Sequence, residues 1–139
     1  MPFDIALRMR LLDDEAVVAA AGKTRGGEPT VDWDERPEQS RYPAVVLEGV
    51  TGFLDQHMTG FQAKRRSRIQ INVLALNATD KVTLRDAVIA AVPPRSTIAG
   101  VRFERIRNAT IIPANEQSGN DFIHRDIIDA VFWYTELET

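Results

Sequence analysis

Apolar residues recur at spacings of three and four along the first twenty positions, which is the period of an amphipathic helix. The series expected on the buried face is Ile5, Met9, Leu12, Ala16 and Ala19. Asp13 and Asp14 interrupt it, and their short carboxylates can accept hydrogen bonds from free backbone N–H groups. Two short helices are therefore expected to meet there. Gly22 is expected to close the last turn as a C-cap.

The segment 23–41 has a different composition from the helices before it. It is rich in Gly, Pro, Asp and Glu, and only Val31 and Trp33 offer apolar anchors. This composition predicts a long loop.

Two strands and a helix are predicted next. The first strand spans 42–51, where valines cluster. The second strand alternates, and its expected core face is Ile69, Ile71, Val73 and Ala75. A helix is predicted over 80–92, with Thr79 or Asp80 as its cap and Pro93-Pro94 as its end.

Two more strands, 101–112 and 122–136, flank a turn-rich stretch at 113–120 and are predicted to form a hairpin. The last strand is apolar on both faces. One face holds Ile128, Ala130, Phe132 and Tyr134, and the other holds Ile127, Val131 and Trp133. This pattern predicts a central strand, or a strand with one face covered by a partner.

The predicted fold is a single α+β domain over residues 1–139, with the long loop at 23–41. Its elements follow the order α-β-β-α-β-β. They form an antiparallel four-stranded sheet with two main helices packed on one side.

Composition narrows the function. The chain is 44% hydrophobic and 27% charged, which suits a folded soluble core, and no apolar run or leader-like start predicts a membrane span or secretion signal. It has no cysteine, and its two histidines, His57 and His124, are far apart. We therefore expect no catalytic, cofactor-binding or metal site, and no enzyme activity.

A basic run at 64–68 is the densest charge feature. On a strand, Lys64, Arg66 and Arg68 would share one face. A solvated face or an ion-pair interface is favoured over nucleic-acid contact, because the net charge of -3 opposes binding to a polyanion. A nucleic-acid-binding module that uses this strand is the alternative.

The connection 51–61 contains four large apolar residues and two glycines. Leu54 and Met58 lie nearest its middle and are the expected contacts for a partner, with His57 between them. For Phe53 and Phe61, closure of the sheet's own core is as strong an interpretation as partner contact.

The order of these signals resembles the phage tail completion, or tail terminator, family. The matching segments are 14–22, 42–46, 57–60, 67–73, 84–88 and 129–134. The resemblance implies a structural virion protein, without substrate or cofactor, that forms a ring, commonly a hexamer, on the head-proximal end of the tail tube. The ring would contact the tail tube protein and head-completion proteins and let DNA pass. Relatives occur in phages, prophages and gene transfer agents, and assembly would take place in the cytoplasm of the bacterial host.

Overall fold

A computed structural model describes residues 2–23, 27–34, 42–53, 56–57, 60–61, 64–106, 109–118 and 121–136. The helices are α1 (Pro2–Leu12), α2 (Glu15–Ala20) and α3 (Ala78–Ala91). The strands are β1 (Val31–Trp33), β2 (Ala44–Phe53), β3 (Gln56–His57), β4 (Gly60–Phe61), β5 (Lys64–Ala75), β6 (Ser96–Ile98), β7 (Val101–Phe103), β8 (Ala109–Pro113), β9 (Glu116–Ser118) and β10 (Asp121–Glu136).

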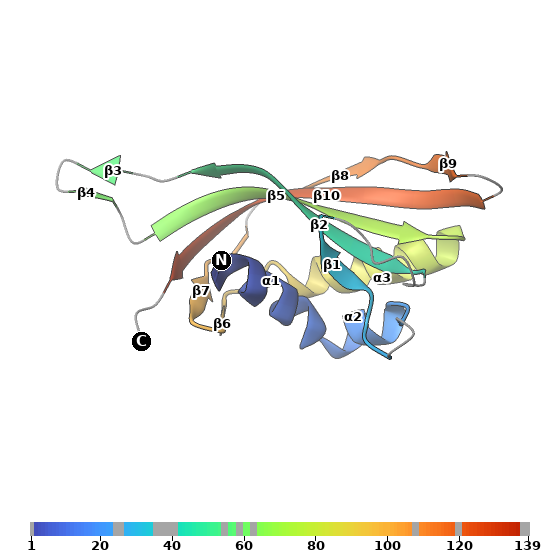
Figure 1. The fold of residues 1–139 in the computed structure, drawn as a ribbon, viewed down its shortest axis with the longest axis horizontal. Coiled ribbons are helices and arrows are strands. Elements are labelled where there is room, and N and C mark those ends of the chain that lie inside the picture. Colours follow the sequence, from blue (N-terminus) through green and yellow to red (C-terminus); the bar gives the residue numbers. More distant parts are fainter. Residues whose placement is uncertain are drawn as a thin grey trace.

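The sheet is mixed and has eight strands (Figure 1). Its main path is β1-β2-β5-β10-β7-β6, while β8 and β9 pair with the first part of β10, and β3 and β4 form a separate hairpin. β1 runs parallel to β2, and the other pairs are antiparallel. The prediction of a four-stranded antiparallel sheet in the order α-β-β-α-β-β is therefore wrong.

One strand that was not predicted, β1, lies in a segment of mostly polar residues. β1 lies inside the predicted loop 23–41, and it is held by hydrogen bonds from Val45 N to Thr30 O at 2.9 Å and from Asp34 N to Leu47 O at 2.8 Å. A strand of three residues is too short to display a period of two. Tertiary pairing, not local pattern, forms it.

The segment predicted as one strand over 101–112 is divided. β7 pairs with the end of β10, whereas β8 pairs with residues 126–130 of the same strand. β7 also pairs with β6 across Ala99 and Gly100, whose φ angles of 52° and 78° suit a tight hairpin turn. The two strands contact different segments of β10, so they are separate elements and not one continuous strand.

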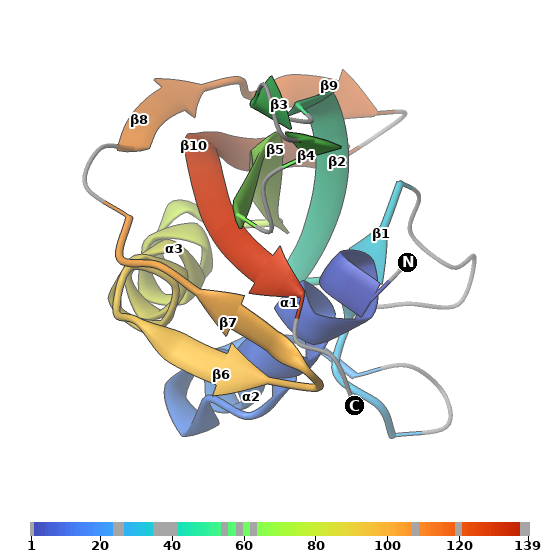
Figure 2. The same ribbon diagram turned by 90° about the vertical axis from the view of Figure 1, so that its left-hand side faces the viewer.

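The helices lie on one side of the curved sheet, and α1 occupies its concave side between β1 and β6 (Figure 2). We call this side of the sheet the inner face and the opposite side the outer face. The inner face of β5 carries the predicted core residues, and β10 is central, as its two apolar faces predicted. The buried residues of these two strands include Ile69, Ile71, Val73, Ile128, Phe132 and Tyr134.

The buried face of α1 differs from the prediction. Its buried residues are Phe3, Ala6, Leu7, Arg10 and Leu11, while Ile5 is 58% and Met9 39% exposed. The helix carries two stripes at helical spacing, and Arg10 falls within the buried one. Its guanidinium donates to the Pro94 carbonyl and lies 5.1 Å from the centre of the Phe103 ring.

The helix ends are set by short polar side chains. Asp14 Oδ1 accepts from Val17 N at 3.0 Å, which confirms the predicted junction of two helices. Asn77, not Thr79 or Asp80, caps α3 by accepting from Asp80 N at 2.8 Å. The prediction of Gly22 as the C-cap of α2 is wrong, because Ala21 is the C-cap. The N–H of Gly22 instead donates to Pro43 O at 2.7 Å.

Candidate assembly surface

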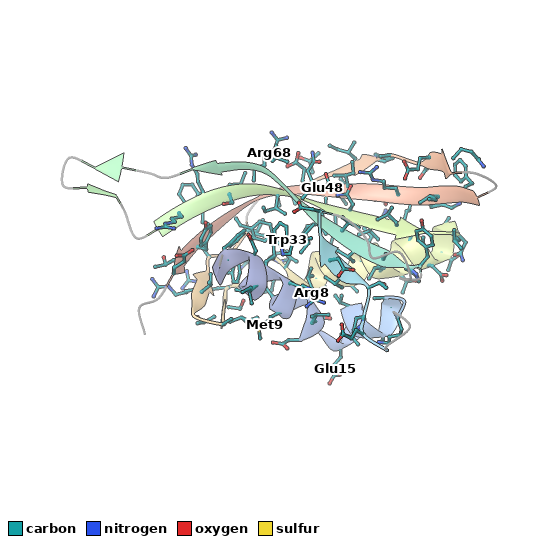
Figure 3. The ribbon with its side chains drawn as sticks, in the orientation of Figure 1. Arg8, Met9, Glu15, Trp33, Glu48 and Arg68 are labelled. Carbon is teal, nitrogen blue, oxygen red and sulfur yellow. The ribbon has the colours of Figure 1, made fainter. Side chains whose placement is uncertain are left out.

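The predicted basic row lies on the outer face. Lys64, Arg66 and Arg68 alternate along β5 with the core residues of the inner face, as expected from a period of two. Figure 3 shows Arg68 on the side of the sheet away from the helices, with Met9 and Glu15 on the opposite side of the molecule. The structure describes the backbone of Lys64, and its side chain lies outside the described part.

Arg68 has an acidic partner within the chain. Its Nε donates to Asp129 Oδ1 at 2.9 Å and its Nη2 donates to Asp129 Oδ2 at 2.6 Å, so a planar guanidinium meets a carboxylate with two parallel bonds. Hydrogen bonds from Arg68 hold the pKa of Asp129 below its ordinary value, and the same pairing raises the pKa of Arg68. One charge of the basic row is therefore matched from β10.

Arg66 lies over an aromatic ring. Its guanidinium carbon is 5.4 Å from the centre of the Trp133 ring, which lies directly across the β5–β10 ladder. This distance is within the range of a cation–π contact. The basic row is therefore interleaved with aromatic and acidic side chains of β10, a cross-strand arrangement that the linear sequence of 64–68 does not contain.

At the other end of the outer face, the side-chain amide of Asn72 is buried. Asn72 is 1% exposed, and its Nδ2 donates to Val46 O at 3.1 Å. Its Oδ1 accepts from Arg125 Nε at 3.0 Å. These bonds connect β2, β5 and β10 and satisfy a polar group that would otherwise be costly to bury.

Apolar side chains are exposed on the same face. Val131 and Trp133 of β10 are each 37% exposed, and Ile112 of β8 is 41% exposed. Thr110 and Ile112 stand opposite Asp129 and Ile127 in the ladder, which places them on the outer face too. No helix of the described part covers this surface.

β8 is a further candidate contact surface, which was not predicted from the sequence. All five of its residues are exposed, and none is charged. One edge pairs with β10, and the other has no partner strand within the described ranges. Uncharged, exposed edges can accept a further strand, so the run Ala109–Pro113 was the signal available in the sequence.

The predicted contact loop is only partly described. Leu54 and Met58 lie outside the described residues. Phe53 ends β2 and His57 lies in β3, and at both positions the structure describes the backbone only. Figure 1 shows β3 and β4 beyond the helices, at the end of the β2–β5 ribbon. The segment predicted as a loop contains two short strands that pair with each other.

Within the described residues, no group of three His, Asp or Glu side chains could hold a metal ion. None of the described helices is long and apolar enough to cross a membrane. Asp126 and Asp129 are three residues apart on β10 and therefore lie on opposite faces of the sheet. On the inner face, two cations of α3 form ion pairs with Asp126. Lys81 Nζ lies 3.4 Å from its Oδ1, and Arg85 Nη1 lies 3.0 Å from its Oδ2.

Comparison with known proteins gives a likeness of fold. No family profile matches the sequence, and no curated protein matches it. Among solved structures, the chain is similar to a chain of a virion of a native gene transfer agent particle. The TM-score is 0.55 at 16% sequence identity, over 96% of this chain and 93% of the other.

This likeness includes nearly all of both chains, so it concerns the whole arrangement of sheet and helices instead of a local motif. At 16% identity it describes the fold alone. Function must be argued from the surfaces.

Proposed function

We propose that this protein is a structural subunit of a phage-type virion. The observation that carries the proposal is the likeness of fold, over nearly its whole length, to a chain of a gene transfer agent virion. The exposed apolar residues of β8, β10 and α1 support it, since a subunit of an assembly needs surfaces that a neighbour can cover.

The specific role that we propose is that of a tail terminator. The protein would form a ring, as a hexamer in the usual case, at the head-proximal end of the tail tube, and would contact the tail tube protein and head-completion proteins. The order of sequence signals supports this role. A ring also requires two different patches on each subunit, and the uncovered β8 edge and the exposed side of α1 are separate surfaces.

The same proposal gives the protein no catalytic role and no cofactor. A nucleic-acid-binding module based on 64–68 is the less favoured function, because Arg68 is engaged by Asp129. DNA binding that falls steeply with salt, in a protein that stays monomeric, would favour that alternative.

Light scattering and electron microscopy test the ring. Purified protein, alone and mixed with its tail tube protein, is expected to give a species several times the 15.6 kDa of the chain, and rings on tube ends. A monomer in every mixture would overturn the proposal, whereas a monomer that assembles only on tubes would support it.

The loop gives a sharper test. Leu54→Asp with Met58→Asp is expected to abolish co-sedimentation with tail tubes while the thermal melt is unchanged, because two buried apolar contacts would be replaced by charges. Leu76→Asp with Val82→Asp is the matched control, since Leu76, just before α3, is 49% exposed and Val82, within α3, is 37% exposed. Equal loss in both variants would remove the loop from the interface.

A further inference from the structure

A recess lies between the segment that follows α3 and the segment that follows β7. It has a volume of about 470 Å³ and is lined by Pro93, Pro94, Arg95 and Arg105. This volume is within the range of pockets that hold small molecules or a few residues of a peptide. None of these residues belongs to the outer face or to the predicted loop.

The walls of the recess are fixed by hydrogen bonds from the core. Ile106 N donates to Pro93 O at 3.0 Å, which holds the segment after β7 against the proline turn. Arg10, only 4% exposed, donates from Nη2 to the Pro94 carbonyl. The two prolines have fixed φ angles, so the recess is formed before any ligand arrives.

The charge around the recess is positive. Arg95 and Arg105 are both exposed, and Arg105 forms no ion pair with any residue that the structure describes. Arg95 Nη2 is 3.5 Å from Glu104 Oε2, and its side chain is 71% exposed, so this contact leaves its other donors to solvent. Beneath the turn, Arg10 adds a third guanidinium whose Nη1 is buried without a hydrogen-bond partner. Burial lowers the pKa of Arg10 to about 10, which still leaves it charged at neutral pH.

We propose that this recess binds a carboxylate-bearing segment of another protein chain, an acidic peptide in extended form. Guanidinium groups match the planar carboxylate with two parallel bonds, and the proline rings offer flat apolar surface to the aliphatic part of a Glu or Asp side chain. A nucleic acid fits less well. The chain carries a net charge of -3, and no aromatic side chain lines the described recess for base stacking. The proposal does not depend on the virion role.

Fluorescence anisotropy tests it on the full chain. The probe is a fluorescein-labelled peptide of alternating Glu and Ala, with a Gln and Ala peptide as its neutral counterpart. The key variant is Arg95→Gln with Arg105→Gln. The matched control is Arg102→Gln, which removes an exposed arginine of the neighbouring strand β7 that does not line the recess. Thermal melts accompany every variant, and Arg105→Gln alone replaces the double variant if the latter does not fold.

The Glu peptide is expected to bind saturably and the Gln peptide not at all. Removing the two recess arginines should weaken binding by about tenfold or more, while Arg102→Gln should change it by less than about twofold. Absence of saturable binding would overturn the proposal, and so would an equal loss in the Arg102→Gln control. A single-stranded DNA oligonucleotide that binds more tightly than the peptide, and loses binding in the same double variant, would reassign the recess to phosphate.

Discussion

The side chains on the two faces of strands β5 and β10 lie in different environments. On the inner face, Ile71 and Phe132 are 0% and 1% exposed against the helices. On the outer face, Arg68 pairs with Asp129, and Trp133 is 37% exposed beside Arg66. The inner face buries the core, whereas the outer face holds paired charges and leaves apolar side chains partly exposed.

Adjacent residues of β10 give the strongest test of this contrast. Phe132→Ala is expected to lower the free energy of unfolding by about 3–5 kcal/mol, because it removes a buried ring that packs on Phe3 and Phe103. Trp133→Ala should cost roughly 1–1.5 kcal/mol, since its ring is already partly in water. Urea denaturation measures both values. Equal losses would show that the two faces do not differ in this way.

Helix α1 extends the contrast to a second element. Leu7→Ala is expected to cost about 2–5 kcal/mol because Leu7 is 0% exposed, whereas Met9→Ala, one face away, should change stability by roughly 0.5 kcal/mol or less. The same urea titration distinguishes them. A large loss at Met9 would restore the face that the sequence pattern selected.

The error at α1 has a physical cause. The helix has apolar residues on both sides, and the side that is buried contains the charged residue Arg10, whereas the series with Ile5 and Met9 is apolar at each position up to Leu12. Arg10 buries its stem against Phe103 and donates to the Pro94 carbonyl. Only the tertiary structure supplies that acceptor, so the pattern of α1 alone could not select the correct face.

Long alternating strands were predictable for the opposite reason. β5 and β10 have 12 and 16 residues, so the period of two repeats often enough to fix which residues are buried. β1 and β6 have three residues each and depend on pairing with distant strands. The candidate surface follows the same division: the alternation placed Arg68 on the outer face, but Asp129 is 61 positions away and its pairing required the register.

Charges on the inner face give the next test. Asp126→Asn is expected to cost roughly 2–3 kcal/mol, because the carboxylate is 3% exposed and the change removes the negative charge that Lys81 and Arg85 pair with, and replaces one acceptor oxygen by an NH2 donor. Asp86→Asn, which removes a 63% exposed carboxylate near the same Arg85, is the control and should change stability by less than about 0.5 kcal/mol. If both variants have the same denaturation midpoint, the inner-face cluster contributes little.

The smallest effect concerns the outer-face carboxylate and depends on pH. Arg68 hydrogen bonds lower the pKa of Asp129 in the folded protein below its unfolded value of about 3.9. The unfolded state therefore takes up the proton first on acidification. The stabilisation from this carboxylate is fully present above about pH 4 and is lost as the pH falls through the lower, folded pKa.

Asp129→Asn removes that titration. The difference in unfolding free energy between wild type and the variant should stay constant from neutral pH to about pH 5 and shrink as the pH falls below about 4. Arg68→Gln should flatten the acid limb in the same way, whereas Arg95→Gln, another exposed arginine, should not. High salt should reduce the difference, because Arg68 is 46% exposed and its charge is screened. A difference that persists unchanged through the acid range would mean that Arg68 does not lower the pKa of Asp129, and that the two charges of the outer face are energetically independent.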